Sequence, residues 1–143
     1  MLGGVHVPFE RGALGHSDAD VLAHAISDAL LGAASLGDLG GRFPAGDDRW
    51  KDADSMLMLQ SCVQALRAAG FDPINVDATV VVDRPKLAPF VDRMRANVAS
   101  RIGLPIDDVS VKAKSSEGLG YTGDGSGICA YAVVSVLAPD RSI

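Results

Sequence analysis

Apolar residues recur at helical spacing in three separate segments of the chain, and apolar runs typical of strands lie before, between and after these segments. We expect helices over 17–37, over 55–69 and over 89–103, each with a glycine at or just beyond its end. Strands are expected at Leu2–Pro8, Ile74–Val82, Val109–Lys114 and Ile128–Leu137. Strands interleaved with helices favour a mixed sheet with helices packed on one face, which is an α/β or α+β layered domain.

Capping residues and spacing refine these helices. Ser17 is a good N-cap for the first helix, and Pro89 suits the first turn of the third. The side chains expected to face the core are Val21, Leu22, Ala25, Ile26, Ala29 and Leu30 in the first helix, Leu59, Cys62, Val63 and Leu66 in the second, and Phe90, Val91, Met94 and Val98 in the third.

Composition narrows the possible classes of protein. The 143 residues, 48% of them hydrophobic, are enough for one domain with its own core, and no linker-like stretch divides 1–143. The formal charge of −5 and the lack of a basic run argue against a nucleic-acid-binding protein. Cys62 and Cys129 have no C-x-x-C spacing, so neither a disulfide framework nor a thiolate zinc site is indicated. Without a membrane-length apolar run or a signal sequence, we expect a soluble cytoplasmic protein with no membrane partner.

A polar stripe lies on the first expected helix. Asp20, His24 and Asp28 recur every four residues, which places a carboxylate one turn above and one turn below an imidazole. Such carboxylates can fix the tautomer of a metal-ligating histidine and raise its basicity. Taken alone, the stripe favours a solvated helix face instead, because one histidine cannot make a zinc site.

Two loops carry residues suited to phosphate binding. The stretch "VKAKSSEGLGYTGDGSG" resembles a phosphate cradle, in which Ser115 and Ser116 add hydroxyl donors and Glu117 can hold a divalent cation. A generic glycine-rich turn before the last strand is the alternative. In "VVDRPKLAPF", Lys86 lies on a proline-bounded turn, where it either reaches a phosphate or is solvated.

Together and in this order, these stretches resemble the 2-C-methyl-D-erythritol 2,4-cyclodiphosphate synthase family of the non-mevalonate isoprenoid pathway. The elements H-S-D-x-D, D-A-L-L-G-A, L-G-D-x-G and K-A-x-x-x-E-x-L-G carry the resemblance, which covers nearly the whole chain. It implies a homotrimer of ferredoxin-like α/β subunits with active sites at the subunit interfaces.

The resemblance also implies a reaction. The substrate 4-diphosphocytidyl-2-C-methyl-D-erythritol 2-phosphate would be cyclised when its 2-phosphate attacks the β-phosphorus and expels CMP, which makes the protein a lyase. The implied cofactors are zinc, which polarises the phosphate under attack, and a second divalent cation, magnesium or manganese, which bridges the diphosphate.

Site residues follow from the resemblance position by position. His24 matches the zinc ligand, with Asp28 behind it, and Glu117 matches the ligand of the second cation. His16 and Ser115 match the catalytic residues, and Ser17 belongs with His16 to a loop over the reacting phosphate. The other implied substrate contacts are Asp38, Leu39, Gly40, Phe43, Pro44, Ala45, Gly46 and Asp47 around the erythritol portion, and Val82, Pro85, Lys86, Leu87, Ala88, Ala113, Lys114, Ser116 and Tyr121 around the cytidine and the diphosphate.

The chain departs from the family pattern in several places. The D-x-H strand with two further zinc ligands is missing, and neither His6 nor His16 obviously replaces it, so we expect an N-terminally incomplete sequence or a chain that has lost turnover. Asp124 stands where the family often has an arginine, Lys114 where a threonine is frequent, and Ala45 where an acid is usual. The first change puts phosphate binding in doubt, and Lys114 is a candidate to restore the positive charge.

Two alternatives therefore stay open beside the enzyme. One is a catalytically silent trimer that still binds cytidine nucleotides. The other is the cyclase domain of a bifunctional cytidylyltransferase and cyclase.

Overall fold

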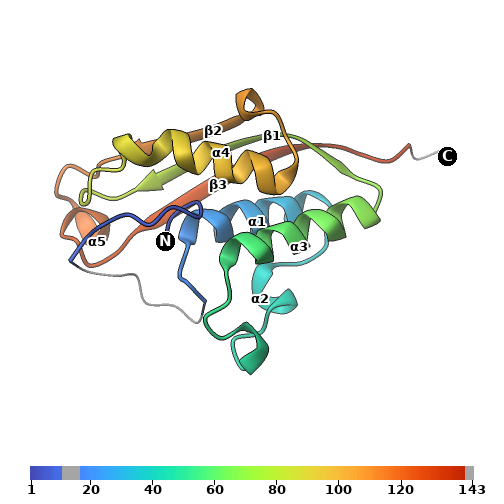
Figure 1. Ribbon diagram of the computed structural model, residues 1–143, viewed down its shortest axis with the longest axis horizontal. Coiled ribbons are helices and arrows are strands. Elements are labelled where there is room, and N and C mark those ends of the chain that lie inside the picture. Colours follow the sequence, from blue (N-terminus) through green and yellow to red (C-terminus); the bar gives the residue numbers. More distant parts are fainter. Residues whose placement is uncertain (11–16, 141–143) are drawn as a thin grey trace.

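A three-stranded mixed sheet is the frame of the structure (Figure 1), a computed structural model that describes residues 1–10 and 17–140. The strand order is β2–β1–β3, with β1 (Asp72–Val81) in the centre. β2 (Val109–Lys114) runs parallel to β1, and β3 (Cys129–Leu137) runs antiparallel to it. The expected mixed sheet is therefore present, with three of its four expected strands.

Three long helices cover one face of this sheet (Figure 1). α1 (Val21–Ala33) packs on β3 and β1, and α4 (Val91–Ile102) packs on β2. α3 (Ser55–Ala68) packs against both of these helices. The short helices are α2 (Leu39–Arg42), η1 (Asp48–Trp50), η2 (Ala88–Phe90), η3 (Ile106–Asp108) and α5 (Gly120–Gly123).

The core lies between the helices and the covered face of the sheet. Every second residue of the central strand is buried there, at Val76, Ala78 and Val80. The predicted inward residues of α3 are all buried, as are Leu22, Ile26, Leu30, Met94 and Val98, whereas Val21, Ala25, Ala29, Phe90 and Val91 are half-buried. The opposite face of the sheet is uncovered in this chain and exposes Tyr131, Val133 and Leu137 of β3.

The prediction of a strand at Leu2–Pro8 was wrong. Gly3 and Gly4 have φ angles of +53° and +67°, and they form a tight turn closed by two hydrogen bonds between Leu2 and Val5. Glycine adopts this left-handed backbone without the steric cost that other residues have, so the pair bends the chain back where alternation had suggested a strand.

The first and third helices differ from their predicted bounds. α1 begins at Val21 because Asp20, not Ser17, is its N-cap, and it ends at Ala33 rather than near Gly37. Pro89 lies in η2, the short turn that precedes α4. Gly103 ends α4 in the left-handed conformation with φ +80°, as predicted.

No helix among the described residues is long and apolar enough to cross a membrane.

Candidate active site

The carboxylates of the polar stripe hold backbone groups, and no hydrogen bond of the described residues joins either of them to His24. Asp20 is fully buried, and its carboxylate accepts hydrogen bonds from the N–H groups of Gly3 (2.9 Å), Gly4 (2.8 Å) and Ala23 (3.0 Å). Asp28 Oδ1 accepts from the N–H of Leu39 at 2.7 Å. Asp20 thus caps α1 and fixes the N-terminal turn, while Asp28 fastens α2 to α1.

His24 is held by hydroxyl groups instead. Its Nε2 lies 2.9 Å from Ser55 Oγ and 3.2 Å from Ser17 Oγ. Ser55 is buried, and its hydroxyl donates to the carboxylate of Asp18. Because a serine hydroxyl has one hydrogen, Ser55 Oγ accepts from His24 Nε2–H. The Nε2 side of the imidazole ring therefore faces Ser55 and Ser17.

The described residues supply only single ligands for the implied metal sites. No three His, Cys, Asp or Glu side chains among residues 1–10 and 17–140 group together as a ligand set. His24 provides one imidazole, and Glu117 provides one carboxylate on an exposed loop. His16, the predicted catalytic residue on the loop over the phosphate, lies outside the described residues, as does most of that loop.

The two predicted phosphate-binding loops meet at the carboxyl ends of parallel strands. β1 and β2 pair in register up to Val81 and Lys114, and the N–H of Val82 then donates to the Lys114 carbonyl at 3.0 Å. Ala113, Lys114 and Ser115 are exposed there, as are Lys86 and Tyr121. This juxtaposition brings together two loops that are about 30 positions apart in the chain.

Asp83 joins these two loops, and the sequence analysis did not single it out. Its Oδ1 accepts from the hydroxyl of Ser115 (2.9 Å) and the N–H of Ser116 (2.6 Å), and its Oδ2 accepts from the N–H of Gly118 (2.7 Å). The two backbone N–H groups are the main reason that the pKa of Asp83 is lowered from its ordinary value, and the charge of Lys86 adds to the effect. A carboxylate of this chain therefore occupies the donors that the glycine-rich sequence suggested for a phosphate.

The other predicted contacts of these two loops differ in their surroundings. Leu87 is buried in the main core, Ala88 is exposed in η2, and Ser116 Oγ bonds with Thr122 Oγ1. Thr122 is buried in α5, so the glycine-rich loop is tied to that helix as well as to Asp83.

The residues predicted to surround the erythritol portion of the substrate lie between positions 38 and 47 and form what we call the 38–47 wall, in another part of the chain. Asp38 caps α2 through the N–H of Gly41 (2.7 Å), and Leu39 is buried beside it. Phe43 is buried edge-on against Trp50, with ring centroids 4.8 Å apart. Gly40 lies within α2 and is exposed. In the segment after Phe43, Pro44, Ala45 and Gly46 are exposed, whereas Asp47 is half-buried and pairs with Arg49. In Figure 1, α2 lies below α1 and α3, away from α5 and the strand ends.

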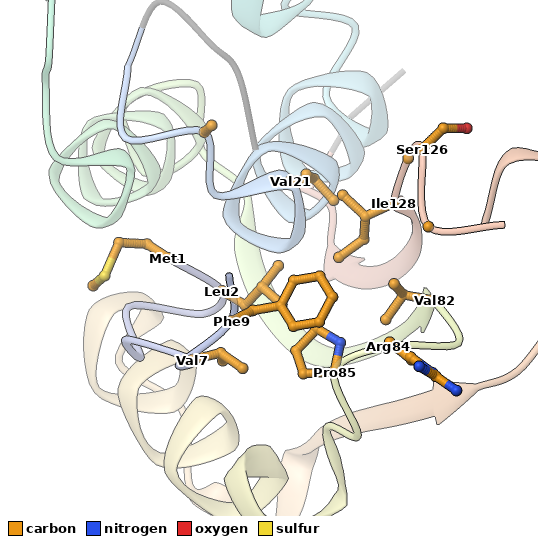
Figure 2. Close-up of a pocket in the computed structure, with 13 residues that line it drawn as sticks. Met1, Leu2, Val7, Phe9, Val21, Val82, Arg84, Pro85, Ser126 and Ile128 are labelled. Carbon is orange, nitrogen blue, oxygen red and sulfur yellow. The ribbon is translucent and has the colours of Figure 1, made fainter. Parts of the chain in front are cut away.

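A cavity of about 460 Å³ opens between the N-terminal segment and the strand ends (Figure 2). Its lining is mostly apolar and includes Met1, Leu2, Val7 and Phe9, Ala19 and Val21 before and in α1, the loop residues Val82, Arg84 and Pro85, and residues 125–128. Val82 and Pro85 are predicted site residues, so the cavity borders the nucleotide side of the predicted site.

Comparisons with known proteins agree on one family. The model of the YgbB family matches residues 1–137. A curated relative from Moorella thermoacetica, named 2-C-methyl-D-erythritol 2,4-cyclodiphosphate synthase, is 54% identical over 96% of this chain and 84% of its own length.

Solved structures match as well. The bifunctional IspDF from Campylobacter jejuni has a TM-score of 0.91 and 39% identity over 95% of this chain, which spans 37% of that protein. A 2C-methyl-D-erythritol-2,4-cyclodiphosphate synthase in a CDP-bound form has a TM-score of 0.87 and 35% identity, and the match covers 96% of this chain and 89% of that one.

Proposed function

The chain belongs to the YgbB family, and from this we infer that it is an enzyme with the activity of its curated relatives. It converts 4-diphosphocytidyl-2-C-methyl-D-erythritol 2-phosphate to 2-C-methyl-D-erythritol 2,4-cyclodiphosphate and CMP, a lyase reaction of isoprenoid biosynthesis. The observation that carries this conclusion is 54% identity to such a synthase over 96% of the chain.

The reaction needs no nucleophile from the protein. A bond forms between an oxygen of the 2-phosphate and the β-phosphorus, and the bond from the β-phosphorus to the oxygen that leaves with CMP breaks. The attacking 2-phosphate and the β-phosphorus belong to one substrate molecule. The main task of the protein is therefore to hold the substrate in a bent conformation with its diphosphate fixed.

We assign the nucleotide diphosphate to the two loops at the strand ends. Lys86 brings a positive charge next to the Ser115–Gly118 loop, and the CDP-bound relative shares this fold over 96% of the chain. His16, Ser17 and the 38–47 wall are assigned to the reacting phosphate and the erythritol portion, as the resemblance implies.

We propose that the protein is a homotrimer of ferredoxin-like subunits with each site shared between subunits. The wall near α2 and the loops near α5 lie apart within one chain (Figure 1). The uncovered sheet face, with Tyr131, Val133 and Leu137 more than 60% exposed, offers an apolar surface that a second copy would bury.

We also expect zinc and a second divalent cation, magnesium or manganese, in the working cytoplasmic enzyme. His24 and Glu117 are the described residues proposed as ligands, one for each ion.

The test is CMP release, followed by chromatography with the substrate, zinc and magnesium present. The enzyme produces CMP in proportion to the substrate consumed, and Lys86→Ala raises KM because a charge near the diphosphate is lost. CDP binding without CMP release would instead identify the silent nucleotide-binding relative. The bifunctional alternative has no better support, because the curated relatives that this chain matches at 54–58% identity are named as the synthase alone.

A further inference from the structure

The carboxylate of Asp83 is the one side-chain group, among the described contacts, that bonds three donors of the glycine-rich loop. It receives the hydroxyl of Ser115 and the backbone N–H groups of Ser116 and Gly118 at 2.6–2.9 Å. The backbone of Asp83 is held in place as well, because its N–H donates to the carbonyl of Thr122 at 3.1 Å. The loop after β1 and the loop after β2 are thus joined through this residue.

The loop that Asp83 holds has an unfavourable backbone of its own. Glu117 has a φ of +54° and Gly118 a φ of +80°, and the left-handed region is costly for a residue with a Cβ such as Glu117. The N–H groups on either side of Glu117 are the ones that bind Asp83. Three charge-assisted hydrogen bonds to one carboxylate offset this cost and select the observed conformation.

On its other side the loop makes one close approach to α5. A Cβ added to Gly123 of α5 would lie 2.3 Å from the carbonyl carbon of Gly118. Gly118 is therefore held between α5 on one side and the carboxylate of Asp83 on the other.

We infer that Asp83 is a positioning residue for the cyclisation, which holds Ser115 and Glu117 in place for the substrate diphosphate. This inference rests on the proposed function. When the hydroxyl of Ser115 turns to a phosphate oxygen, Asp83 loses one donor and keeps both backbone N–H groups, so the loop stays in place. A carboxylate that merely filled the place of a phosphate would instead have to leave when the substrate binds.

Two substitutions and one matched control test this role. Asp83→Ala removes all three acceptor contacts, and Asp83→Asn keeps the shape but replaces one acceptor oxygen by an N–H donor. Asp77→Asn is the control, because Asp77 also links β1 to β2 through Lys112 (2.7 Å) without touching the loop. The readouts are kcat and KM of the full chain, the affinity for CDP, and hydrogen exchange at the amides of Ser116 and Gly118.

Loss of positioning predicts that kcat/KM falls roughly tenfold or more in both Asp83 variants. CDP binding weakens, and exchange at the two amides becomes faster, whereas Asp77→Asn changes none of these more than about twofold. Unchanged exchange and unchanged kcat/KM in the Asp83 variants would overturn the inference, and so would tighter CDP binding, which would mean that the carboxylate competes with phosphate. If the unsubstituted protein shows no turnover, the proposed function fails, and CDP affinity and amide exchange still decide the role of Asp83.

Discussion

Single polar residues of α1 have defined partners that their spacing did not reveal. Asp20, His24 and Asp28 form a row, but the first binds the N-terminal turn, the second binds Ser55 and the third binds α2. Spacing along a helix reports which residues share a face, and it does not report which loop folds over that face.

Asp20→Ala is expected to lower the free energy of unfolding by about 2–4 kcal/mol, because three N–H groups lose their acceptor at a fully buried position. The measurement is urea denaturation followed by circular dichroism. Asp54→Ala is the control, because the exposed Asp54 caps α3 through the N–H of Met56, so its loss should cost only about 0.5–1 kcal/mol. Equal losses in the two variants would contradict the role given to Asp20.

Burial raises the pKa of the Cys62 thiol and outweighs the lowering effects of a hydrogen bond with Ser27 and of the charge of Arg42, and the charge of Asp28 adds a smaller rise. In the folded protein Cys62 should therefore stay protonated and resist iodoacetamide at pH 8.5. Modification is measured by mass spectrometry in a Cys129→Ser background, in which Cys62 is the remaining cysteine. Rapid labelling without urea would show that the thiol is not shielded as the structure indicates.

At the scale of elements, the long helices and three strands were predictable, and the short pieces were not. α3 ends at Ala68 and β2 spans Val109–Lys114, both within one residue of the prediction, because apolar spacing and a terminal glycine mark them. α2 and α5 have four residues each, too few to show a period. The strand expected at Leu2–Pro8 failed because the paired glycines outweighed a short alternation.

Gly103→Ala should destabilise the protein by about 1 kcal/mol or more, because φ is +80° at this helix end and the new Cβ would lie 3.2 Å from Arg67 Nη2. Gly32→Ala is the matched control, since Gly32 lies inside α1 with nothing within 4 Å of its Cβ position. There alanine should leave stability unchanged or raise it by about 0.5–1 kcal/mol. Equal stability of Gly103→Ala and Gly32→Ala in thermal unfolding would show that the end of α4 does not need a glycine.

For the whole molecule, the sequence predicted a sheet with helices on one face, but it did not predict which loops lie together at the candidate site. Alternating strands and helices indicated one sheet with helices on one face, whereas the order β2–β1–β3 depends on pairings between distant segments. The meeting of the 82–88 and 115–118 loops follows from that order. Asp83 could not be recognised beforehand, because its partners lie about 35 residues away in the chain.

Val133→Glu should dissociate the proposed homotrimer, because it replaces an apolar side chain, 70% exposed in the single chain, by a charged one on the surface that the proposed assembly would bury. Light scattering after size-exclusion chromatography measures the mass. Leu57→Glu on α3, where the leucine is 55% exposed, is the control and should leave the mass of the trimer unchanged. A monomeric unsubstituted protein, or dissociation by the control alone, would contradict the assigned interface.

Phosphorus NMR of the purified protein with 4-diphosphocytidyl-2-C-methyl-D-erythritol 2-phosphate, zinc and magnesium shows directly whether this enzyme closes the diphosphate ring. Ring closure predicts that the signals of the substrate are replaced by those of a cyclic diphosphate and of CMP in equal amounts. Unchanged substrate signals in a folded sample that binds CDP would contradict the assignment as a cyclising enzyme.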